Sequence, residues 1–320
     1  MADLPRVLIT RPMPETVQTA AQAAFDVEIR ASTKPMSAAE MRAALALYDG
    51  VLPTLRDNFS EEIFAEFEAP RCKVLANFGV GYNHIDVVAA QARGITVTNT
   101  PGAVTDATAD IAMTLMLMSV RRAGEGERLV RAGKWEGWHP TQMLGLHLSG
   151  KIVGIVGMGR IGQAIARRCH YGFGMEVVFV NRSAKTVDFP ARQVDDLAAL
   201  AAVADVIVAA TPGGAETRHL VGVEEFATMK PTAHFINISR GDVVDEAALI
   251  AALQAGQIAG AGLDVYEHEP EVPEALRKLE NVTLLPHLGT AALEVREAMG
   301  HMALENLRAF FAGETPPNKV

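Results

Sequence analysis

The sequence predicts an α/β protein with two Rossmann-like or flavodoxin-like domains, each a doubly wound parallel sheet, and a cleft between them. Strand-like and helical segments alternate along the first hundred residues, and the same alternation starts again near Lys151. Alternation of this kind is typical of a parallel sheet with helices on both faces. A chain of 320 residues has room for two such domains.

The first domain is expected to start with a short β-branched strand at residues 6–10 and a helix within residues 14–25. Ser37 suits the N-cap of an Ala-rich helix at residues 38–48. Further strand-like runs lie at residues 25–30, 50–54, 73–81 and 94–100.

The second domain is expected to begin with a strand at residues 151–157 and a helix at residues 161–170. Later strand-like runs lie at residues 176–181, 205–210, 233–239, 261–266 and 282–286. Helical segments at residues 105–121 and 291–311 would connect the two domains. We therefore expect a discontinuous substrate domain of residues 1–100 plus 288–320 and a dinucleotide-binding Rossmann domain of residues 101–287.

The composition favours a cytoplasmic protein with small-molecule ligands. A net charge of −9 and a pI near 5.5 argue against nucleic acid or an anionic membrane as partner. Cys72 and Cys169 give no disulfide framework, and the N-terminus has no signal-peptide pattern. The apolar run at residues 111–120 is too short to span a bilayer and reads as a buried helix.

A glycine-rich turn indicates dinucleotide binding. The segment GIVGMGRIG contains the G-x-G-x-x-G pattern as Gly157, Gly159 and Gly162. In this pattern the first glycine permits a tight turn, the second a close approach to pyrophosphate, and the third close packing of helix on strand. The following helix N-terminus offers N–H groups to phosphate. An ordinary glycine turn is the alternative, but the flanking strand and helix favour the dinucleotide site.

The end of the next strand, VFVNRSAK, has a cation where NAD-binding proteins carry an acid. Asn181, Arg182 and Ser183 occupy this position, and Lys185 adds further positive charge. A carboxylate there selects NAD, whereas an arginine accommodates the 2′-phosphate of NADP. The sequence therefore predicts that NADP(H) is preferred, with NAD(H) and an unliganded basic loop as the alternatives.

Three later segments carry ionisable residues at the ends of expected strands. They are NISRGDVVDE, LDVYEHEP and PHLG, which contain Arg240, Glu269 and His287. Because ligands bind at the carboxyl ends of parallel strands, these side chains could share one site. Each also has an ordinary structural explanation, as a salt bridge, a turn carboxylate or a packed histidine.

With these motifs in this order, together with NFGVGYNHIDV and VTNTPGAVTDATAD, the chain resembles the D-isomer-specific 2-hydroxyacid dehydrogenases. Within that family it is similar to the glyoxylate/hydroxypyruvate reductase (D-glycerate dehydrogenase) branch. The resemblance implies NADPH-dependent reduction of glyoxylate or hydroxypyruvate to glycolate or D-glycerate, and a homodimer.

The resemblance also implies roles for single residues. Arg240 would bind the substrate carboxylate and polarise the 2-oxo group, and His287 would be the general acid, hydrogen-bonded to Glu269. A neighbouring carboxylate favours the imidazolium that such an acid needs. Val80 and Gly81 would offer backbone N–H groups to the substrate.

Further positions follow from the same resemblance. Trp138 would reach into the partner subunit's site, with a loop anchor as the alternative. Beyond the glycine turn, Asn181, Arg182, Ser183 and His287, the cofactor positions would be Thr108, Met158, Arg160, Ile161, Thr211, Pro212, Thr217, Ile238, Ser239, Asp264 and Gly289. The segment ATPGG at residues 210–214 departs from the family's usual pattern and puts the adenosine side in doubt.

Several alternatives stay open. Larger 2-keto acids, such as 2-ketogluconate or aryl pyruvates, are other substrates. Glu269 argues against a formate dehydrogenase, and the end of the chain at Val320 against a phosphoglycerate dehydrogenase with regulatory domains. A nucleotide-sensing binding protein of the same fold is the rival from another class. The histidines show no metal-ligand spacing, so we expect no metal.

Overall fold

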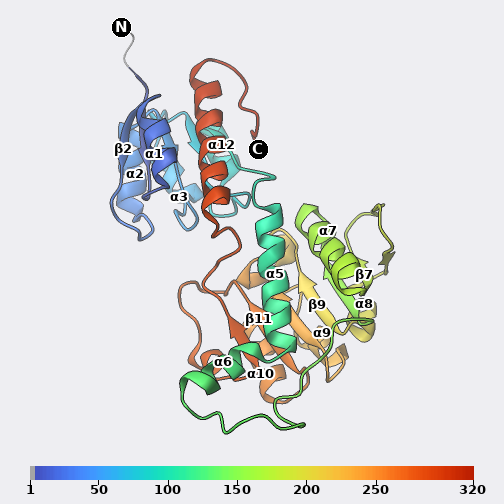
Figure 1. Cartoon of the computed structure of the whole chain (residues 1–320). Coiled ribbons are helices and arrows are strands. Elements are labelled where there is room, and N and C mark those ends of the chain that lie inside the picture. Colours follow the sequence, from blue (N-terminus) through green and yellow to red (C-terminus); the bar gives the residue numbers. More distant parts are fainter. Residues whose placement is uncertain (1–3) are drawn as a thin grey trace. The chain divides into compact units, whose positions relative to one another are not determined.

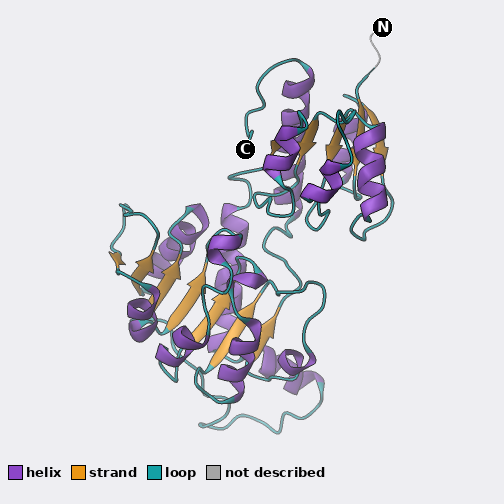
Figure 2. Ribbon diagram, turned by 180° about the vertical axis from the view of Figure 1, so that it is seen from behind, coloured by secondary structure: helices purple, strands orange, loops and turns teal. Residues whose placement is uncertain are grey.

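The computed structural model describes residues 4–320 and divides into two compact units. Unit 1 comprises the chain up to Val104 together with Ala291–Val320, and unit 2 comprises Thr105–Thr290. The boundaries expected from the sequence follow residues 100 and 287, whereas this division follows Val104 and Thr290. In each unit a layer of strands lies between helices (Figure 2).

Unit 1 contains a five-stranded parallel sheet in the order β2-β1-β3-β4-β5. Its strands are β1 (Arg6–Ile9), β2 (Asp26–Ile29), β3 (Gly50–Leu52), β4 (Val74–Ala76) and β5 (Thr96–Thr98). Its helices are α1 (Glu15–Gln22), α2 (Ala38–Leu47), α3 (Glu61–Ala65), α4 (Val87–Ala92) and α12 (Leu293–Phe311). This strand order is that of flavodoxin-like sheets.

Both faces of this sheet are buried, as expected of parallel sheets. Along β1, Val7 and Ile9 pack with the cluster that includes residues of α1 and α12, whereas Leu8 packs with that of α2, α3 and α4. Ser37 caps α2 through a capping box with Glu40. The C-terminal segment returns to the same sheet, since the N–H of Val320 donates to the carbonyl of Val97 (3.0 Å).

Unit 2 contains a seven-stranded parallel sheet in the order β12-β11-β10-β9-β6-β7-β8. Its strands are β6 (Ile152–Val156), β7 (Glu176–Val180), β8 (Arg192–Gln193), β9 (Val206–Ala209), β10 (His234–Asn237), β11 (Gly260–Leu263) and β12 (Val282–Leu284). From β6 the chain proceeds outward through β7 and β8, then returns to the other side of β6 with β9. The strand order therefore reverses beside β6, which is where open α/β sheets bind ligands.

Helices cover both faces of this second sheet. They are α5 (Thr105–Val120), α6 (Ala123–Arg131), α7 (Arg160–Arg167), α8 (Leu197–Val203), α9 (Val223–Thr228), α10 (Glu246–Gln254) and α11 (Glu274–Arg277), with a π turn at Arg168–Gly172 and 3₁₀ turns at Ala215–Thr217 and Gly241–Val243. Figure 1 shows α5 running along the sheet near β11. The two meet closely, because a Cβ at Gly262 would lie 3.0 Å from Leu115 Cβ.

The fold class predicted from the sequence is confirmed, since each unit is a doubly wound parallel sheet. The expected strands and helices are present, whereas the short α3 and β8 were not expected. The apolar run at residues 111–120 lies in α5. Among the described residues no helix is both long and apolar enough to cross a membrane.

Candidate active site

Three consecutive strands of unit 2 end in the loops that carry the candidate catalytic residues. Arg240 follows β10, Glu269 follows β11, and His287 follows β12. These strands are parallel neighbours. The three side chains therefore belong to the same edge of the sheet.

Arg240 is positioned by the turn that leaves β10. The Asn237 side chain organises this turn, because its Oδ1 accepts the N–H of Ser239 (3.0 Å) and its Nδ2 donates to the carbonyl of Arg240 (2.9 Å). Nη1 of Arg240 donates to the Ser239 carbonyl (2.7 Å). Burial lowers the pKa of Arg240 from its ordinary value, against the opposing charges of Glu269 and Asp242. Arginine still keeps its charge at any working pH.

Gly241, next to Arg240, packs closely against the loop that carries Glu269. A Cβ at this position would lie 1.8 Å from the carbonyl carbon of Tyr266 and 2.2 Å from the amide nitrogen of Glu267. These neighbours are backbone atoms, so only glycine fits without moving one loop. The Arg240 turn and the Glu269 turn are thus packed directly against each other.

Glu269 and His287 form a hydrogen-bonded acid–base pair. Nδ1 of His287 lies 3.0 Å and 3.2 Å from the two carboxylate oxygens of Glu269, and the N–H of Tyr266 donates to the same carboxylate (3.2 Å). Burial raises the pKa of Glu269, but the hydrogen bond and charge of His287 outweigh it, so this pKa lies below its ordinary value. Nδ1 is thereby engaged, which leaves Nε2 for proton transfer.

Asp264 holds the His287 loop in place. Its two carboxylate oxygens accept the N–H groups of Leu288 (2.6 Å) and Gly289 (2.8 Å), and its carbonyl accepts the N–H of His287 (3.0 Å). Burial raises the pKa of Asp264, although these N–H donors oppose the effect. Thr108 adds a bond from its hydroxyl to the Gly289 carbonyl (3.2 Å). His287 itself has left-handed backbone geometry, with φ of 56°.

The glycine-rich turn follows β6, where the strand order reverses. A Cβ at Gly157 would lie 2.9 Å from the Ala210 carbonyl oxygen, and one at Gly162 would lie 2.1 Å from the Gly157 carbonyl oxygen. Gly159, by contrast, faces open space and directly precedes α7. The residues present therefore fit a dinucleotide, with backbone free to approach a pyrophosphate at the α7 N-terminus.

A hydrogen-bonded frame supports the segment after β7. Oδ1 of Asn181 accepts the N–H of Met158 (3.1 Å), and its Nδ2 donates to the Ser183 carbonyl (2.9 Å). Nε2 of Gln193 donates to the carbonyls of Asn181 (3.2 Å) and Ser183 (3.3 Å). The side chain of Arg182 is exposed and pairs with Glu216. The segment at residues 181–186 contains no carboxylate.

The loop after β9 lies against both the glycine-rich turn and the candidate residue Arg240. The Ser239 hydroxyl donates to the Thr211 carbonyl, and the Thr217 hydroxyl to the Pro212 carbonyl (2.8 Å). A Cβ at Gly213 would lie only 2.6 Å from Cγ of Arg240. The absence of a side chain at Gly213 therefore leaves room for the Arg240 stem.

Comparison with known proteins agrees with this geometry. Residues 113–289, more than half of the chain, match the family described as D-isomer specific 2-hydroxyacid dehydrogenase, NAD binding domain. The chain belongs to this family. The family assignment made from the sequence is thus confirmed, and the protein is an NAD(P)-dependent enzyme of the D-2-hydroxyacid dehydrogenase class.

Individual relatives match over nearly the whole chain. A glyoxylate reductase from Thermococcus litoralis is 43% identical over 99% of this chain and 96% of its own length. An NADPH-dependent glyoxylate/hydroxypyruvate reductase from Sinorhizobium meliloti, solved with NADP and malonate, has a TM-score of 0.86 at 36% identity, covering 99% of this chain and 97% of that chain. A glyoxylate reductase from Paecilomyes thermophila has a TM-score of 0.87 at 32% identity, covering 100% of this chain and 99% of that chain.

The other positions expected for this dehydrogenase family fall into three places. The expected cofactor positions lie in unit 2, most of them on the loops described above. Thr108 lies in the first turn of α5, Arg160 and Ile161 open α7, and Ile238 is buried just after β10. Val80 and Gly81 lie in unit 1, in a turn fixed by Asn77 Nδ2, which donates to the Gly81 carbonyl (3.0 Å). Trp138 lies in the segment between α6 and β6 and is 80% exposed.

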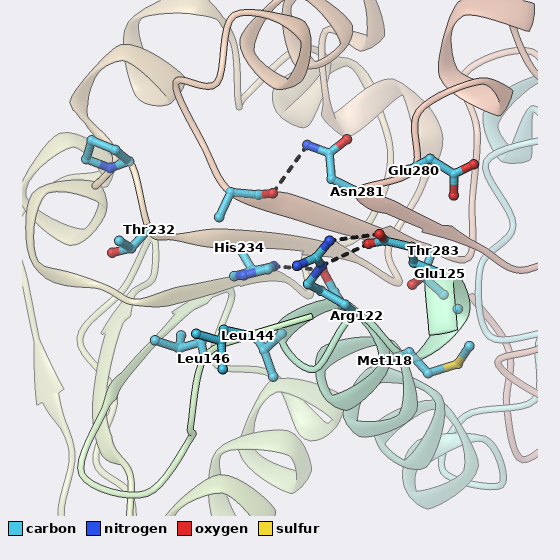
Figure 3. A pocket seen from close by; sticks show the side chains of 16 residues that line it. Met118, Arg122, Glu125, Leu144, Leu146, Thr232, His234, Glu280, Asn281 and Thr283 are labelled. Atoms are coloured by element: carbon cyan, nitrogen blue, oxygen red, sulfur yellow. Dashed lines mark hydrogen bonds and ion pairs between the residues drawn. The ribbon is translucent and has the colours of Figure 1, made fainter. Parts of the chain in front are cut away.

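A separate cavity of about 560 Å³ lies at the opposite end of the unit 2 sheet. Figure 3 shows His234, which begins β10, and Asn281, which precedes β12, among its lining residues. Arg122 and Glu125 in its wall pair with each other (2.7 Å). His234 bonds to the Ser119 hydroxyl (2.8 Å), and burial lowers its pKa to about 4. These strand beginnings are remote from the catalytic loops, so we assign the cavity no part in the reaction.

Sequence reasoning overlooked three residues that contact or organise the loops of the candidate site: Asn237, Gly213 and Gly241. Asn237 ends a strand directly before the catalytic arginine, which is a usable signal for a turn-forming side chain. The two glycines need the structure, because the atoms that exclude a side chain come from distant segments. Over the described residues, no group of three or more His, Cys, Asp or Glu side chains is arranged to hold a metal ion.

Proposed function

We propose that this enzyme reduces glyoxylate and hydroxypyruvate with NADPH, giving glycolate and D-glycerate. One observation carries the proposal. A hydrogen-bonded Glu269–His287 pair and the half-buried Arg240 follow three neighbouring strands of the same sheet that bears the glycine turn.

In this proposal Arg240 binds the substrate. Its guanidinium holds the carboxylate by charge-assisted hydrogen bonds and draws electron density from the 2-oxo group. Partial burial strengthens both effects, because water screens a half-buried charge less than an exposed one. Val80 and Gly81 are proposed to bind the same carboxylate through their N–H groups.

His287 is proposed as the proton donor. With Nδ1 bonded to Glu269, Nε2 carries the proton that goes to the 2-oxo oxygen. Glu269 stabilises the imidazolium before transfer and fixes the ring afterwards. The bound nicotinamide cofactor supplies the hydride.

NADPH is the proposed cofactor because the position that selects NAD by a carboxylate has Asn181, Arg182 and Ser183 instead. The Sinorhizobium meliloti relative, named as NADPH-dependent, supports this choice. NAD(H) is the alternative that the experiment below separates.

We further propose a cytoplasmic homodimer in which Trp138 contributes to the partner's site. Support comes from exposed apolar side chains close together in the sequence: Val130, Trp135, Trp138 and Leu144. Sedimentation of the protein at micromolar concentration as monomer alone would remove the homodimer from the proposal.

Initial rates test the proposed function. We would measure initial rates of reduction of glyoxylate and of hydroxypyruvate, each with NADPH and with NADH, for the wild type and for Arg182→Ala. We expect NADPH to be preferred and Arg182→Ala to lose that preference. Equal use of NADH by the wild type would refute the cofactor assignment, and absence of turnover with both acids would refute the substrates.

A further inference from the structure

Arg182, the residue proposed to bind the 2′-phosphate of NADP, forms an ion pair in this structure. Nη1 of Arg182 contacts Oε2 of Glu216, which lies 34 positions later in the chain. The two side chains are 87% and 80% exposed. Arg182 is the residue on which the NADP assignment depends, so its partner bears directly on cofactor choice.

Glu216 is held near this position by its own backbone. It is the middle residue of the 3₁₀ turn Ala215–Thr217, which follows β9. The hydroxyl of Thr217 fixes the turn by donating to the carbonyls of Pro212 (2.8 Å) and Gly214 (3.2 Å). Because β7 and β9 flank β6 on either side, the loops that carry Arg182 and Glu216 both start beside the glycine turn.

The backbone around Arg182 is also fixed. The bonds of Asn181 and Gln193 hold the strand end, while the guanidinium is exposed and contacts Glu216. Lys185 is exposed in the same segment. Glu216 therefore brings a negative charge from another loop to a segment that is otherwise basic.

We propose that Glu216 sets cofactor selectivity by competing with the ribose 2′-phosphate for Arg182. This inference rests on the proposed function, in which Arg182 binds that phosphate. A guanidinium fork can hold a carboxylate or a phosphate, so the phosphate of NADP must displace Glu216 or lie beside its charge. NAD has a hydroxyl at this point and displaces nothing. Glu216 thus weakens the binding of NADP but not that of NAD, and it thereby reduces the preference for NADP over NAD.

The test substitutes Glu216→Gln, which keeps the shape and removes the charge. Glu224→Gln is the matched control, because Glu224 is exposed at the start of α9, the next helix. The probes are adenosine 2′,5′-bisphosphate and 5′-AMP, titrated by calorimetry at low salt, alongside kcat/KM for NADPH and NADH. The same measurements are made in the Arg182→Ala background.

We expect Glu216→Gln to raise the affinity for adenosine 2′,5′-bisphosphate by about two- to fivefold, which is the scale of an exposed ion pair. 5′-AMP and the Glu224→Gln control should stay within experimental error of the wild type. Most of the gain should vanish in the Arg182→Ala background, and also at high salt.

Two results overturn the proposal in different ways. If the wild type favours the bisphosphate through Arg182 but Glu216→Gln changes nothing, or changes both probes equally, the role of Glu216 is wrong and the NADP site stands. If the wild type binds both probes alike and Arg182→Ala has no effect, the 2′-phosphate site itself is wrong and both proposals fail.

Discussion

The substitution Gly213→Ala tests how Arg240, the proposed substrate-binding residue, is positioned. Gly213 itself has no proposed part in the chemistry. A Cβ built there lies 2.6 Å from Cγ of Arg240, 3.3 Å from its Cβ and 3.6 Å from its Cδ. Ordinary contacts between carbon atoms are about 3.5–4.0 Å. Gly213→Ala therefore forces the stem of Arg240 to move by about 1 Å, because a crowded Cγ cannot swing aside as a side-chain tip would.

The displacement matters because the guanidinium must meet the substrate in one geometry. A misplacement of about 1 Å can cost about 10²-fold in rate. Part of the shift can be taken up by the loop at residues 210–214, so we expect kcat/KM for glyoxylate to fall by about 10- to 100-fold. Much of this decrease in kcat/KM should appear as a higher KM, since Arg240 is proposed to bind the carboxylate. The affinity for 5′-AMP should hardly change.

Steady-state kinetics with glyoxylate and NADPH would be compared for the wild type, Gly213→Ala and Gly172→Ala. Gly172 is the matched control, because a Cβ there meets nothing within 4 Å. Thermal unfolding of each variant separates a local shift from general destabilisation. Activity of Gly213→Ala within twofold of the control would refute the link between this glycine and Arg240.

Two further substitutions probe the catalytic residues themselves. Arg240→Ala should lower kcat/KM by about 10²-fold or more, the scale of a charge-assisted hydrogen bond lost in the transition state. A variant within tenfold of the wild type would contradict its role in binding. Glu269→Gln should lower kcat about tenfold and move the upper pH limit of reduction downward, because the imidazolium loses its anionic partner. An unchanged pH–rate profile in Glu269→Gln would count against the pair. In the wild type the pKa of Glu269 is lowered, so its carboxylate stays ionised below the usual carboxyl range and the pair with His287 is lost only in stronger acid.

Much of the architecture was predictable because parallel strands bury both faces and so appear as continuous apolar runs. The runs at residues 151–157 and 205–210 are of this kind, and they became β6 and β9. The two-residue β8 and the five-residue α3 have too few residues for a periodic pattern to be detected.

Parts of the site needed the structure, for a physical reason. The spacing of Gly157 and Gly162 was enough to predict the glycine-rich turn. The order of the motifs was enough to predict Arg240, Glu269 and His287 as a set. Gly241 is different, since what forbids a side chain there is the backbone of Tyr266, which is distant in sequence. The pairing of Arg182 with Glu216 likewise joins two loops that meet only once the strands are ordered.

The division of the chain separates two groups of the proposed site residues. The glycine turn, Arg240, Glu269 and His287 all belong to the segment Thr105–Thr290, whereas Val80 and Gly81 belong to the other unit. If the proposed roles hold, the groups for proton transfer and for cofactor binding are therefore encoded in one continuous segment. Substitutions at Val80 and Gly81 can then alter the contacts to the substrate without touching that segment.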